Sequence, residues 1–335
     1  MDTSESSSAD TNVESDPQKS SNQSFRSRLS HLLIQVLILL ISAHLFSSLA
    51  RFHWVADLVA QLRVQLCIGS LIAVAMSVGL YRWKLSMLSL AVLIYSVLPI
   101  VPYFINDSNR SDRSDFKLVT ANVLTSNQQT GRFMDWVNSE NPDLLLVMEI
   151  DSNWEKALEQ IHANYPYRLV QSRADNFGIG VYSKIRWDRA EIFYADSMNL
   201  ESIDIRFENF ETGSYQGPLQ IIGTHPIPPL GRIKWRSRNQ QLLKLADYRQ
   251  FDSECIITGD FNLTPWSPFF EELTDKTDTR DGALGFGIEP SWNLLPTLIG
   301  ALKLDHVIVS EELGVFRYRV GPSLGSDHRP IICEF

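Results

Sequence analysis

The sequence predicts three membrane-spanning helices followed by an α/β domain in which a β-sheet core is flanked by helices. Three early apolar runs are each close to the roughly 20 residues that cross a bilayer. After residue 115, short apolar segments of strand character alternate with helical patterns, as in sheets that are covered by helices. The predicted parts are a disordered cytoplasmic tail (1–30), the membrane helices (31–104), a linker (105–115) and the folded domain (116–335).

The amino-terminal tail is rich in Ser, Asp, Asn, Thr and Glu and has too little apolar surface to form a core. The apolar runs that follow it contain few charges, so we expect them to cross a membrane. A buried helical bundle of a soluble protein is the alternative. The predicted spans are Leu32–Ala50, Val64–Leu80 and Leu85–Phe104.

The distribution of Lys and Arg sets the expected orientation, because cytoplasmic loops are enriched in these residues. More of them precede the first span or lie in the second loop than flank the first loop: Lys19, Arg26, Arg28, Arg82 and Lys84 against Arg51 and Arg63. With three spans, this places the domain outside the cytoplasm. We therefore expect a multi-pass protein of the inner cell membrane, although Arg110, Arg113 and Lys117 favour the opposite orientation.

Within the domain, short apolar runs predict strands, and apolar residues at helical spacing predict helices. The first helix ends before Asn141-Pro142, because a residue that precedes proline avoids helical geometry. The predicted helices are Arg132–Asn138, Trp154–His162 and Ile233–Tyr248. The predicted strands are Phe116–Leu124, Asp143–Ile150, Tyr167–Gln171, Gly178–Ser183, Ile203–Phe207, Leu219–Thr224, the strand through Ile257 to Asp260, Asp305–Ser310, Val315–Val320 and Pro330–Phe335.

Polar side chains stand at the ends of these apolar strands. Asp260 and Asn262 are two residues apart, so on an extended chain they point to the same side. If the strand ends meet at one edge, their carboxylate and carboxamide oxygens suit Mg²⁺ or Mn²⁺. A metal with His and Asp around a phosphoryl group is a hydrolytic set. The residues are Asn122, Glu149, His225, Asp260, Asn262, Asp305, Asp327 and His328.

The composition argues against some classes of function. The formal net charge is −9, whereas dedicated nucleic-acid binders usually show a basic footprint. Nucleic acid is therefore disfavoured as a partner, although the overall charge does not exclude a local basic patch. The three cysteines form no spaced metal or redox motif.

Five motifs resemble, in order, those of the endonuclease/exonuclease/phosphatase superfamily, which includes DNase I-like nucleases, inositol-polyphosphate phosphatases and neutral sphingomyelinases. They are Thr120-Ala121-Asn122-Val123, Val147-Met148-Glu149, Gly259-Asp260-Phe261-Asn262, Leu304-Asp305-His306 and Ser326-Asp327-His328-Arg329-Pro330. The resemblance covers about residues 116–335, and the joint occurrence of Gly-Asp-Phe-Asn and Ser-Asp-His is its most specific part. It implies a four-layer α/β sandwich of two mixed β-sheets flanked by helices.

The resemblance also implies a metal site. Glu149 matches the metal-binding glutamate, Asn122 its neighbour at the metal, and Asp327 a carboxylate beside it. Mg²⁺ or Mn²⁺ is the implied cofactor. Leu124 stands where some members carry an acidic or amide residue, so the chain departs from their pattern at one metal-side contact.

The implied catalytic residues surround the expected phosphate. Asp260 matches the residue that orients or deprotonates the attacking water, and Asn262 matches its partner at the phosphate. His328 matches the histidine that contacts a phosphate oxygen or acts as an acid, and Asp305 matches the aspartate that orients it. His225 matches the second histidine of the DNase I and sphingomyelinase-like branches. The implied reaction is metal-assisted attack of water on phosphorus.

The loop His225-Pro226-Ile227-Pro228-Pro229 and the helix after it resemble a membrane-anchored bacterial branch of the superfamily that includes VanJ-like glycopeptide-resistance proteins. Hydrolysis of a lipid pyrophosphate is the chemistry which that branch implies. Arg236 and Arg238 on the helix are expected to bind substrate phosphates as two-pronged donors. The alternative is that they form a solvated helix face.

The sequence thus favours a membrane-anchored, Mg²⁺-dependent phosphohydrolase that acts on a phosphoester or pyrophosphate. The expected partners are the lipid bilayer and a phosphate-containing substrate, with a lipid-linked phosphate as one candidate, and we expect a monomer. An extracytoplasmic DNase I-like endonuclease is the alternative enzyme. A member of the superfamily without activity, serving as a membrane adaptor, is the non-enzymatic alternative, and the nearly complete set of motif residues argues against it.

Overall fold

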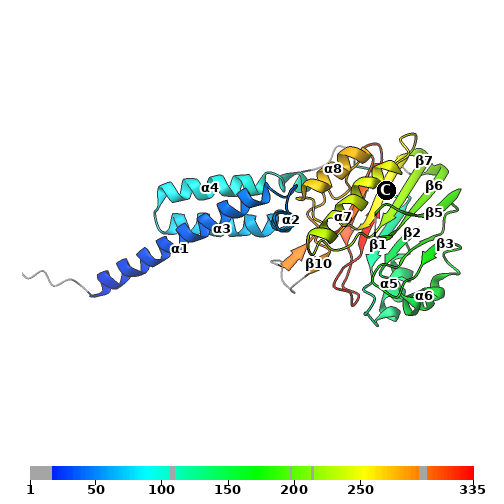
Figure 1. Ribbon diagram of the computed structural model, residues 1–335, viewed down its shortest axis with the longest axis horizontal. Coiled ribbons are helices and arrows are strands. Elements are labelled where there is room, and N and C mark those ends of the chain that lie inside the picture. Colours follow the sequence, from blue (N-terminus) through cyan, green and yellow to red (C-terminus); the bar gives the residue numbers. More distant parts are fainter. Residues whose placement is uncertain (1–16, 106–109, 197, 213–214, 294–299) are drawn as a thin grey trace, which may run out of the picture.

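Two mixed β-sheets lie face to face in the folded domain (Figure 1). The computed structural model describes residues 17–105, 110–196, 198–212, 215–293 and 300–335. Within these ranges the first sheet has the strand order β13-β14-β1-β2-β4-β3, and the second has β5-β6-β7-β8-β12-β9. The parallel pairs β1–β2 and β7–β8 stand among antiparallel ones, so both sheets are mixed.

The strands of the first sheet are β13 (Arg317–Val320), β14 (Ile331–Glu334), β1 (Lys117–Asn122), β2 (Leu144–Met148), β4 (Ile179–Ser183) and β3 (Tyr167–Gln171). Those of the second are β5 (Arg189–Tyr194), β6 (Glu201–Glu211), β7 (Gln216–Thr224), β8 (Glu254–Asp260), β12 (Asp305–Val309) and β9 (Arg280–Asp281). A separate ribbon contains β10 (Trp292–Asn293) and β11 (Ala301–Leu302).

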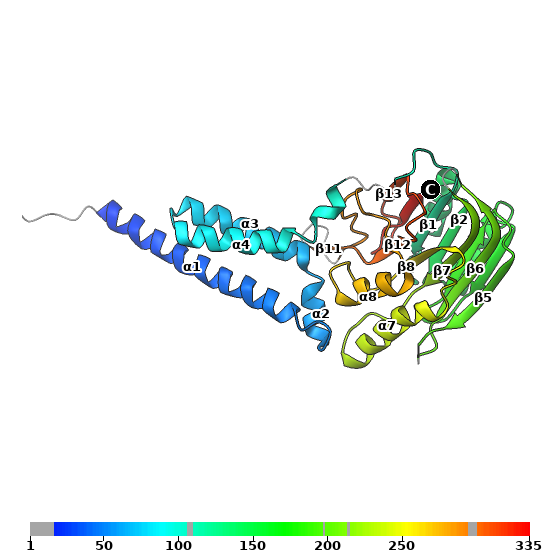
Figure 2. The ribbon, with the colours of Figure 1, turned by 90° about the horizontal axis from the view of Figure 1, so that it is seen from above.

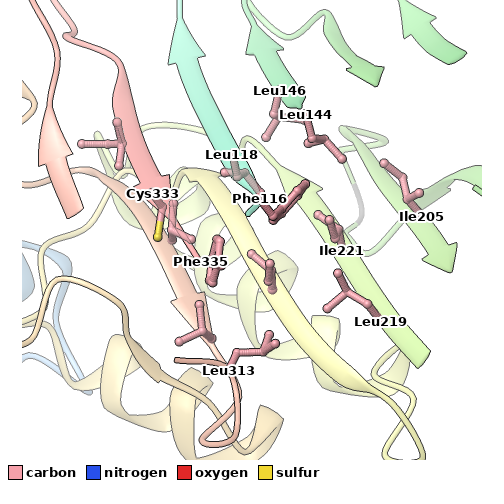
Figure 3. Close-up of a cluster of buried hydrophobic side chains, with 14 of the residues drawn as sticks. Phe116, Leu118, Leu144, Leu146, Ile205, Leu219, Ile221, Leu313, Cys333 and Phe335 are labelled. Carbon is pink, nitrogen blue, oxygen red and sulfur yellow. The ribbon is translucent and has the colours of Figure 1, made fainter. Parts of the chain in front are cut away.

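The main hydrophobic core fills the space between the two sheets (Figure 3). Leu118 and Leu146 of the first sheet lie across from Ile205 and Ile221 of the second, and all four side chains are buried. Fully burying one such side chain stabilises the fold by about 1.5–3 kcal/mol. The same core therefore holds the two sheets together and fixes the relative positions of the strand ends.

Helices cover the outer face of each sheet. Because β2 and β4 are buried at every position, the first sheet needs a second covering layer, which α5 (Thr130–Glu140), α6 (Ser152–Leu158) and η2 (Glu159–Ile161) provide. The second sheet is covered by α7 (Arg232–Lys244), η3 (Leu245–Asp247) and α8 (Pro268–Thr277). The expected pair of mixed sheets flanked by helices is confirmed.

Three helices extend away from this domain as a bundle: α1 (Pro17–Ser47), α3 (Arg63–Gly79) and α4 (Trp83–Val97) (Figures 1 and 2). The short helix α2 (Trp54–Ala60) lies at the junction between bundle and domain. The turn η1 (Val101–Phe104) then leads into the domain.

The three predicted spans are not confirmed as such. Among the described residues, the segment Ser24–Ser47 of α1 is long and apolar enough to cross a membrane by itself. Helices α2 and α3 meet this test only together, and they are bent by 59° at their junction. Helix α4 is apolar but has only 15 residues. Length and composition therefore support one spanning helix, or two if the bent pair counts as one.

Two predicted boundaries were wrong. Helix α1 already begins at Pro17, so residues 17–30 are not a disordered tail, whereas residues 1–16 lie outside the described part. Contacts across the bundle stabilise this extension: Arg26 donates to Leu80 O at 3.4 Å, and Arg82 donates to Ser30 Oγ at 3.3 Å. Helix α4 ends at Val97, before two prolines, and the buried Tyr103 belongs to the domain core.

The linker prediction, 105–115, covers residues 106–109, which lie outside the described part. Its later residues are tied to the domain, since Ser111 N–H donates to Val315 O. Strand β5 and helix α8 were missed altogether. Helix α8 had a readable signal in Ser267, whose side chain caps the helix, followed by Pro268 at the first helical position.

Candidate active site

Strand ends from both sheets meet at one edge of the sandwich. In the register of β8 and β12, Asp260 stands opposite Asp305. Asn122, at the end of β1 in the other sheet, donates from Nδ2 to Asp260 Oδ2 at 3.2 Å. His225 directly follows β7, which runs parallel to β8 and therefore ends at the same edge. The predicted convergence of these strand ends is thus present in the structure.

Asp260 is the centre of this arrangement. Its Oδ2 atom lies 3.5 Å from His225 Nε2 and 3.5 Å from His328 Nε2. On the other side of the His328 ring, Nδ1 lies 2.7 Å from Asp305 Oδ2, so this imidazole stands between two carboxylates. Asn262 N–H donates to Asp260 Oδ1 at 2.9 Å and thereby fixes the rotation of the carboxylate. The side chains of Asp260, His225, His328 and Asp305 are all buried.

The charges of these groups depend on one another. Burial alone would lower the pKa of His328, but the carboxylates of Asp305 and Asp260 outweigh it and raise the pKa to about 10. Burial alone would raise the pKa of Asp260, but His328 and His225 outweigh it and hold the pKa at about 2. At neutral pH the site therefore contains a carboxylate that can orient water or accept its proton, next to an imidazolium.

Glu149 follows β2 and lies in the same hydrogen-bond network. Its Oε1 atom accepts from Asn122 Nδ2 at 2.9 Å, and its Oε2 atom accepts from Thr125 N–H at 3.2 Å. The Asn122 amide therefore joins the carboxylates of Glu149 and Asp260, while the Asn122 oxygen accepts from Leu124 N–H at 3.0 Å. In this orientation Asn122 positions two carboxylates, and direct metal ligation by its oxygen stays a prediction.

The backbone is strained around these residues. Leu124, Glu149 and Asn262 have φ values of 60°, 63° and 50°, in the left-handed region that non-glycine residues rarely adopt. All three line the cavity described next. Strain of this kind persists only where the surrounding structure imposes it, and it gathers at functional sites.

A cavity of about 790 Å³ opens over Asp260 and His328. One part of its wall is polar and includes Glu149, Asn262 and Asp327. Another part is apolar, and its residues come from the loop after β7, from the β10–β11 region and from helix α2: Leu58, Ile227, Leu230, Trp292, Leu302 and Leu304. The site therefore combines the polar residues of a hydrolytic centre with an apolar wall, which these six residues form.

The donor set suits a hard divalent cation. Glu149, Asp260 and Asp327 offer carboxylate oxygens to one cavity, and Mg²⁺ and Mn²⁺ prefer such ligands. Asp260, Asp305 and His328 also lie close enough together to hold an ion. That second group is a poorer fit, because His328 Nδ1 is hydrogen-bonded to Asp305 and His328 Nε2 lies 3.5 Å from the Asp260 carboxylate, so both ring nitrogens already face carboxylates. Metal ligation by Glu149 and Asp327, which line the same cavity, stays a prediction.

The expected substrate role of Arg238 was wrong. Its guanidinium is fully buried, donates to Asn262 O at 2.7 Å, and is paired with Asp57 of helix α2. An arginine on a predicted surface helix suggests solvent exposure, and only the packing of α2 against α7 buries this one. Arg236 is exposed but does not line the cavity, so its role stays a prediction. Sequence reasoning missed Lys234, the only Lys or Arg among the described residues that line the cavity.

Comparisons with known proteins agree with this geometry. The sequence profile of the Endonuclease/Exonuclease/phosphatase family matches residues 119–328, which include every expected catalytic and metal-site residue. No curated protein matches the chain.

Solved structures share the fold. A 3′ phosphatase, NExo, from Neisseria bound to a product DNA hairpin has a TM-score of 0.54 and 15% identity, over 66% of this chain and 99% of that one. An AP endonuclease from Archaeoglobus fulgidus has a TM-score of 0.53 and 13% identity, over 66% and 99%. A humanized D. rerio TDP2 has a TM-score of 0.52 and 16% identity, over 66% and 98%. At these identities the likeness concerns the fold alone.

Proposed function

The chain belongs to the endonuclease/exonuclease/phosphatase family, and we propose that it is a membrane-anchored, divalent-metal-dependent hydrolase of a lipid-linked phosphoester or pyrophosphate. The observation that carries the proposal is the cavity, in which Asp260 and His328 share one space with an apolar wall. Part of that wall is Leu58, which belongs to the helix that joins the bundle to the domain.

The chain's own residues provide the parts of a hydrolytic reaction. The Asp260 carboxylate orients a water molecule and takes its proton as the water attacks phosphorus, while the bond from phosphorus to the leaving phosphate or ester oxygen breaks and its electron pair departs with that oxygen. The His328 imidazolium, held by Asp305, stabilises negative charge on a non-bridging phosphate oxygen. His225 and Asn262 line the same space and add donors toward that oxygen. A divalent cation held at Glu149 and Asp327 would polarise the phosphoryl group.

The apolar wall favours a lipid-linked substrate over a polynucleotide. A polynucleotide needs a basic track for its phosphates. Among the described residues that line the cavity, Lys234 is the only Lys or Arg, and the formal net charge of the chain is −9. The wall contributed by Leu58, Leu230 and Leu302 instead fits an acyl or polyprenyl chain whose phosphate reaches Asp260.

The polarity of the helical bundle supports membrane anchoring. Serines lie between the helices, where His44 Nε2 is 2.8 Å from Ser96 Oγ and Ser70 is also fully buried. Large apolar side chains cover the outside: Ile38, Leu39, Leu45, Leu71, Ile72 and Met87 are each more than half exposed. A water-soluble bundle does not expose so many large apolar side chains, whereas helices in lipid do so and pack partly through small polar residues.

The direction of the helices supports the expected topology. The start of α1 and the α3–α4 turn lie at the end of the bundle remote from the domain (Figure 2). That end contains Arg26, Arg82 and Lys84, which favours its placement in the cytoplasm. The proposal therefore includes an extracytoplasmic domain on a multi-pass anchor, as in the membrane-anchored branch of the family.

A DNase I-like endonuclease outside the cytoplasm is the second candidate. The similarity to the fold of the AP endonuclease and of the DNA-bound 3′ phosphatase favours it. The shortage of basic residues around the cavity argues against it.

The test uses the full chain in lipid nanodiscs. Phosphate release from a polyprenyl pyrophosphate and from inorganic pyrophosphate, and nicking of plasmid DNA, are measured with Mg²⁺ and with EDTA. Metal-dependent release that Asp260→Asn abolishes and His328→Gln slows strongly, with the plasmid intact, is the expected result. Nicked plasmid without phosphate release would establish the nuclease instead.

A wall variant tests the lipid part separately. Leu230→Asp should lower kcat/KM for the polyprenyl substrate by about tenfold, because it removes most of one apolar contact, and should leave inorganic pyrophosphate unaffected. Phe251→Asp is the matched control, since Phe251 is comparably exposed but does not line the cavity. Equal losses on both substrates would remove the argument for lipid recognition.

A further inference from the structure

A buried aspartate lies where the helical segment meets the domain. Asp57 belongs to α2, between the bundle and helices α7 and α8 (Figures 1 and 2), and it is 0% exposed. The hydrogen-bond partners of its carboxylate within the described residues come from the domain. Trp235 Nε1 donates to Asp57 Oδ2 at 3.1 Å, Ser267 Oγ donates to Asp57 Oδ1 at 2.7 Å, and Arg238 Nη2 also donates to Asp57 Oδ2. The carboxylate thus fixes α2 against α7 and α8.

Arg238 connects this carboxylate to the active site. Its side chain is 0% exposed, so its charge has no solvent and depends on Asp57. Its Nη1 atom donates to Asn262 O at 2.7 Å, and its Nε atom donates to Asn239 Oδ1 at 2.6 Å. Asp57 therefore fixes the orientation of the guanidinium, and that orientation determines the contact that Arg238 makes with the backbone oxygen of Asn262.

Asn262 transmits that position to two catalytic elements. Its N–H donates to Asp260 Oδ1 at 2.9 Å, and its Nδ2 atom donates to Pro226 O, next to His225, at 3.0 Å. Its φ of 50° is a conformation that needs support from the surrounding structure. The following residue is held independently, because Leu263 O lies 2.9 Å from His306 Nε2. Loss of the Arg238 contact should therefore affect Asn262 and leave Leu263 in place.

We propose that Asp57 is a positioning residue of the active site, which acts through Arg238 on Asn262 so that the helical segment before the domain sets the catalytic loop. The proposal rests on hydrolysis at Asp260 but not on the identity of the substrate. It makes the preceding helices part of the catalytic unit in addition to their role as an anchor.

The geometry distinguishes this role from a purely structural one. A structural clamp would lower the amount of folded enzyme without changing the turnover of the molecules that remain folded. A positioning residue changes kcat per folded molecule, because small displacements of a catalytic group reduce turnover. The second effect must also disappear once Arg238 can no longer transmit it.

The experiment compares Asp57→Asn, Arg238→Gln and the double variant in the full chain. With activity normalised to the folded fraction, Asp57→Asn should lower kcat by about 10- to 100-fold, with KM changed by less than about threefold. In the Arg238→Gln background, Asp57→Asn should cause no further loss. The proposal is wrong if the losses in kcat of the two single variants multiply in the double variant. It is also wrong if Asp57→Asn leaves kcat per folded molecule unchanged.

Ser267→Ala is the matched control. It removes one hydrogen bond to Asp57 and the cap of α8 but leaves the Arg238 contact intact, so it should lower thermal stability and leave kcat unchanged. Hydrogen exchange gives a readout that needs no substrate. Asp57→Asn should speed exchange of the Asn262 amide, whereas Ser267→Ala should not. This result decides the proposal even if no tested substrate is hydrolysed, and equal exchange in both variants contradicts it.

Discussion

Replacing Asp305 by asparagine should move the alkaline limit of activity toward neutral pH. Asp305 Oδ2 lies 2.7 Å from His328 Nδ1, and after burial its charge is the largest influence on the pKa of His328, which is about 10. Two unit charges about 4 Å apart interact by about 4 kcal/mol at an effective dielectric constant of about 20. Since one pKa unit corresponds to about 1.4 kcal/mol, removing the charge should lower the pKa of His328 by about 3 units.

The sign of the effect follows from which form of His328 is active. The imidazolium stabilises the phosphate oxygen, so activity is lost as the pH rises through the pKa of His328. A lower pKa brings this loss to a lower pH. Below about pH 6 the variant should keep substantial activity, because His328 is then still protonated and Asp260, with a pKa of about 2, is still ionised.

The assay is kcat/KM for phosphate release as a function of pH, with the folded fraction measured by circular dichroism at each pH. His328→Gln provides the reference, because it lacks the titrating imidazole. Its turnover should be slow, and its pH profile should show no alkaline limb from this position. An alkaline limb in Asp305→Asn at the same pH as in the unmodified protein would refute the assignment of His328 as the charged partner.

Three further predictions concern stability and the metal. Gly259→Ala should destabilise the fold by about 2–4 kcal/mol in thermal unfolding, because at its φ of 142° an added Cβ would lie 1.9 Å from the backbone oxygen of Thr224. Gly131→Ala in α5 is the control and should not destabilise the fold, because no atom lies within 4 Å of the added Cβ there. Lys303→Met should cost about 3–5 kcal/mol, because the buried Asp281 loses a partner at 3.3 Å; a loss below about 1 kcal/mol in denaturant unfolding contradicts this. EDTA should abolish turnover and Mg²⁺ or Mn²⁺ should restore it, and Glu149→Gln should raise the Mg²⁺ concentration needed for half-maximal activity.

Local patterns in the sequence were sufficient for much of the fold. Strand β3 was predicted with its observed bounds, and β1, β2, β4 and β12 differ from their predictions by at most two residues at either end. Most residues of these strands are apolar, and polar residues such as Asn122 and Asp305 stand at their ends, which is a local property that the chain shows directly. The polar residues at their ends also identified the candidate site, because parallel neighbours end at the same edge.

Helix boundaries and the extent of the apolar spans were less predictable. The bend between α2 and α3 leaves no mark in hydropathy, and the first turns of α1 are polar. Both features depend on contacts with other helices, such as the hydrogen bond from Arg26 to Leu80 O. Hydropathy measures whether a segment suits lipid, but it does not tell where the helix bends or begins.

By itself, the sequence determined most of the sheet-forming segments and the polar groups that end them. Only the tertiary structure decided which charges face the cavity. Arg238 was predicted to bind phosphate, yet it is buried against Asp57, which lies 181 residues earlier in the chain. A buried charge needs a partner at contact distance, and for residues so far apart in sequence that partner is chosen by the packing of whole elements. The pairing of α2 with the catalytic loop therefore exists only in the folded protein.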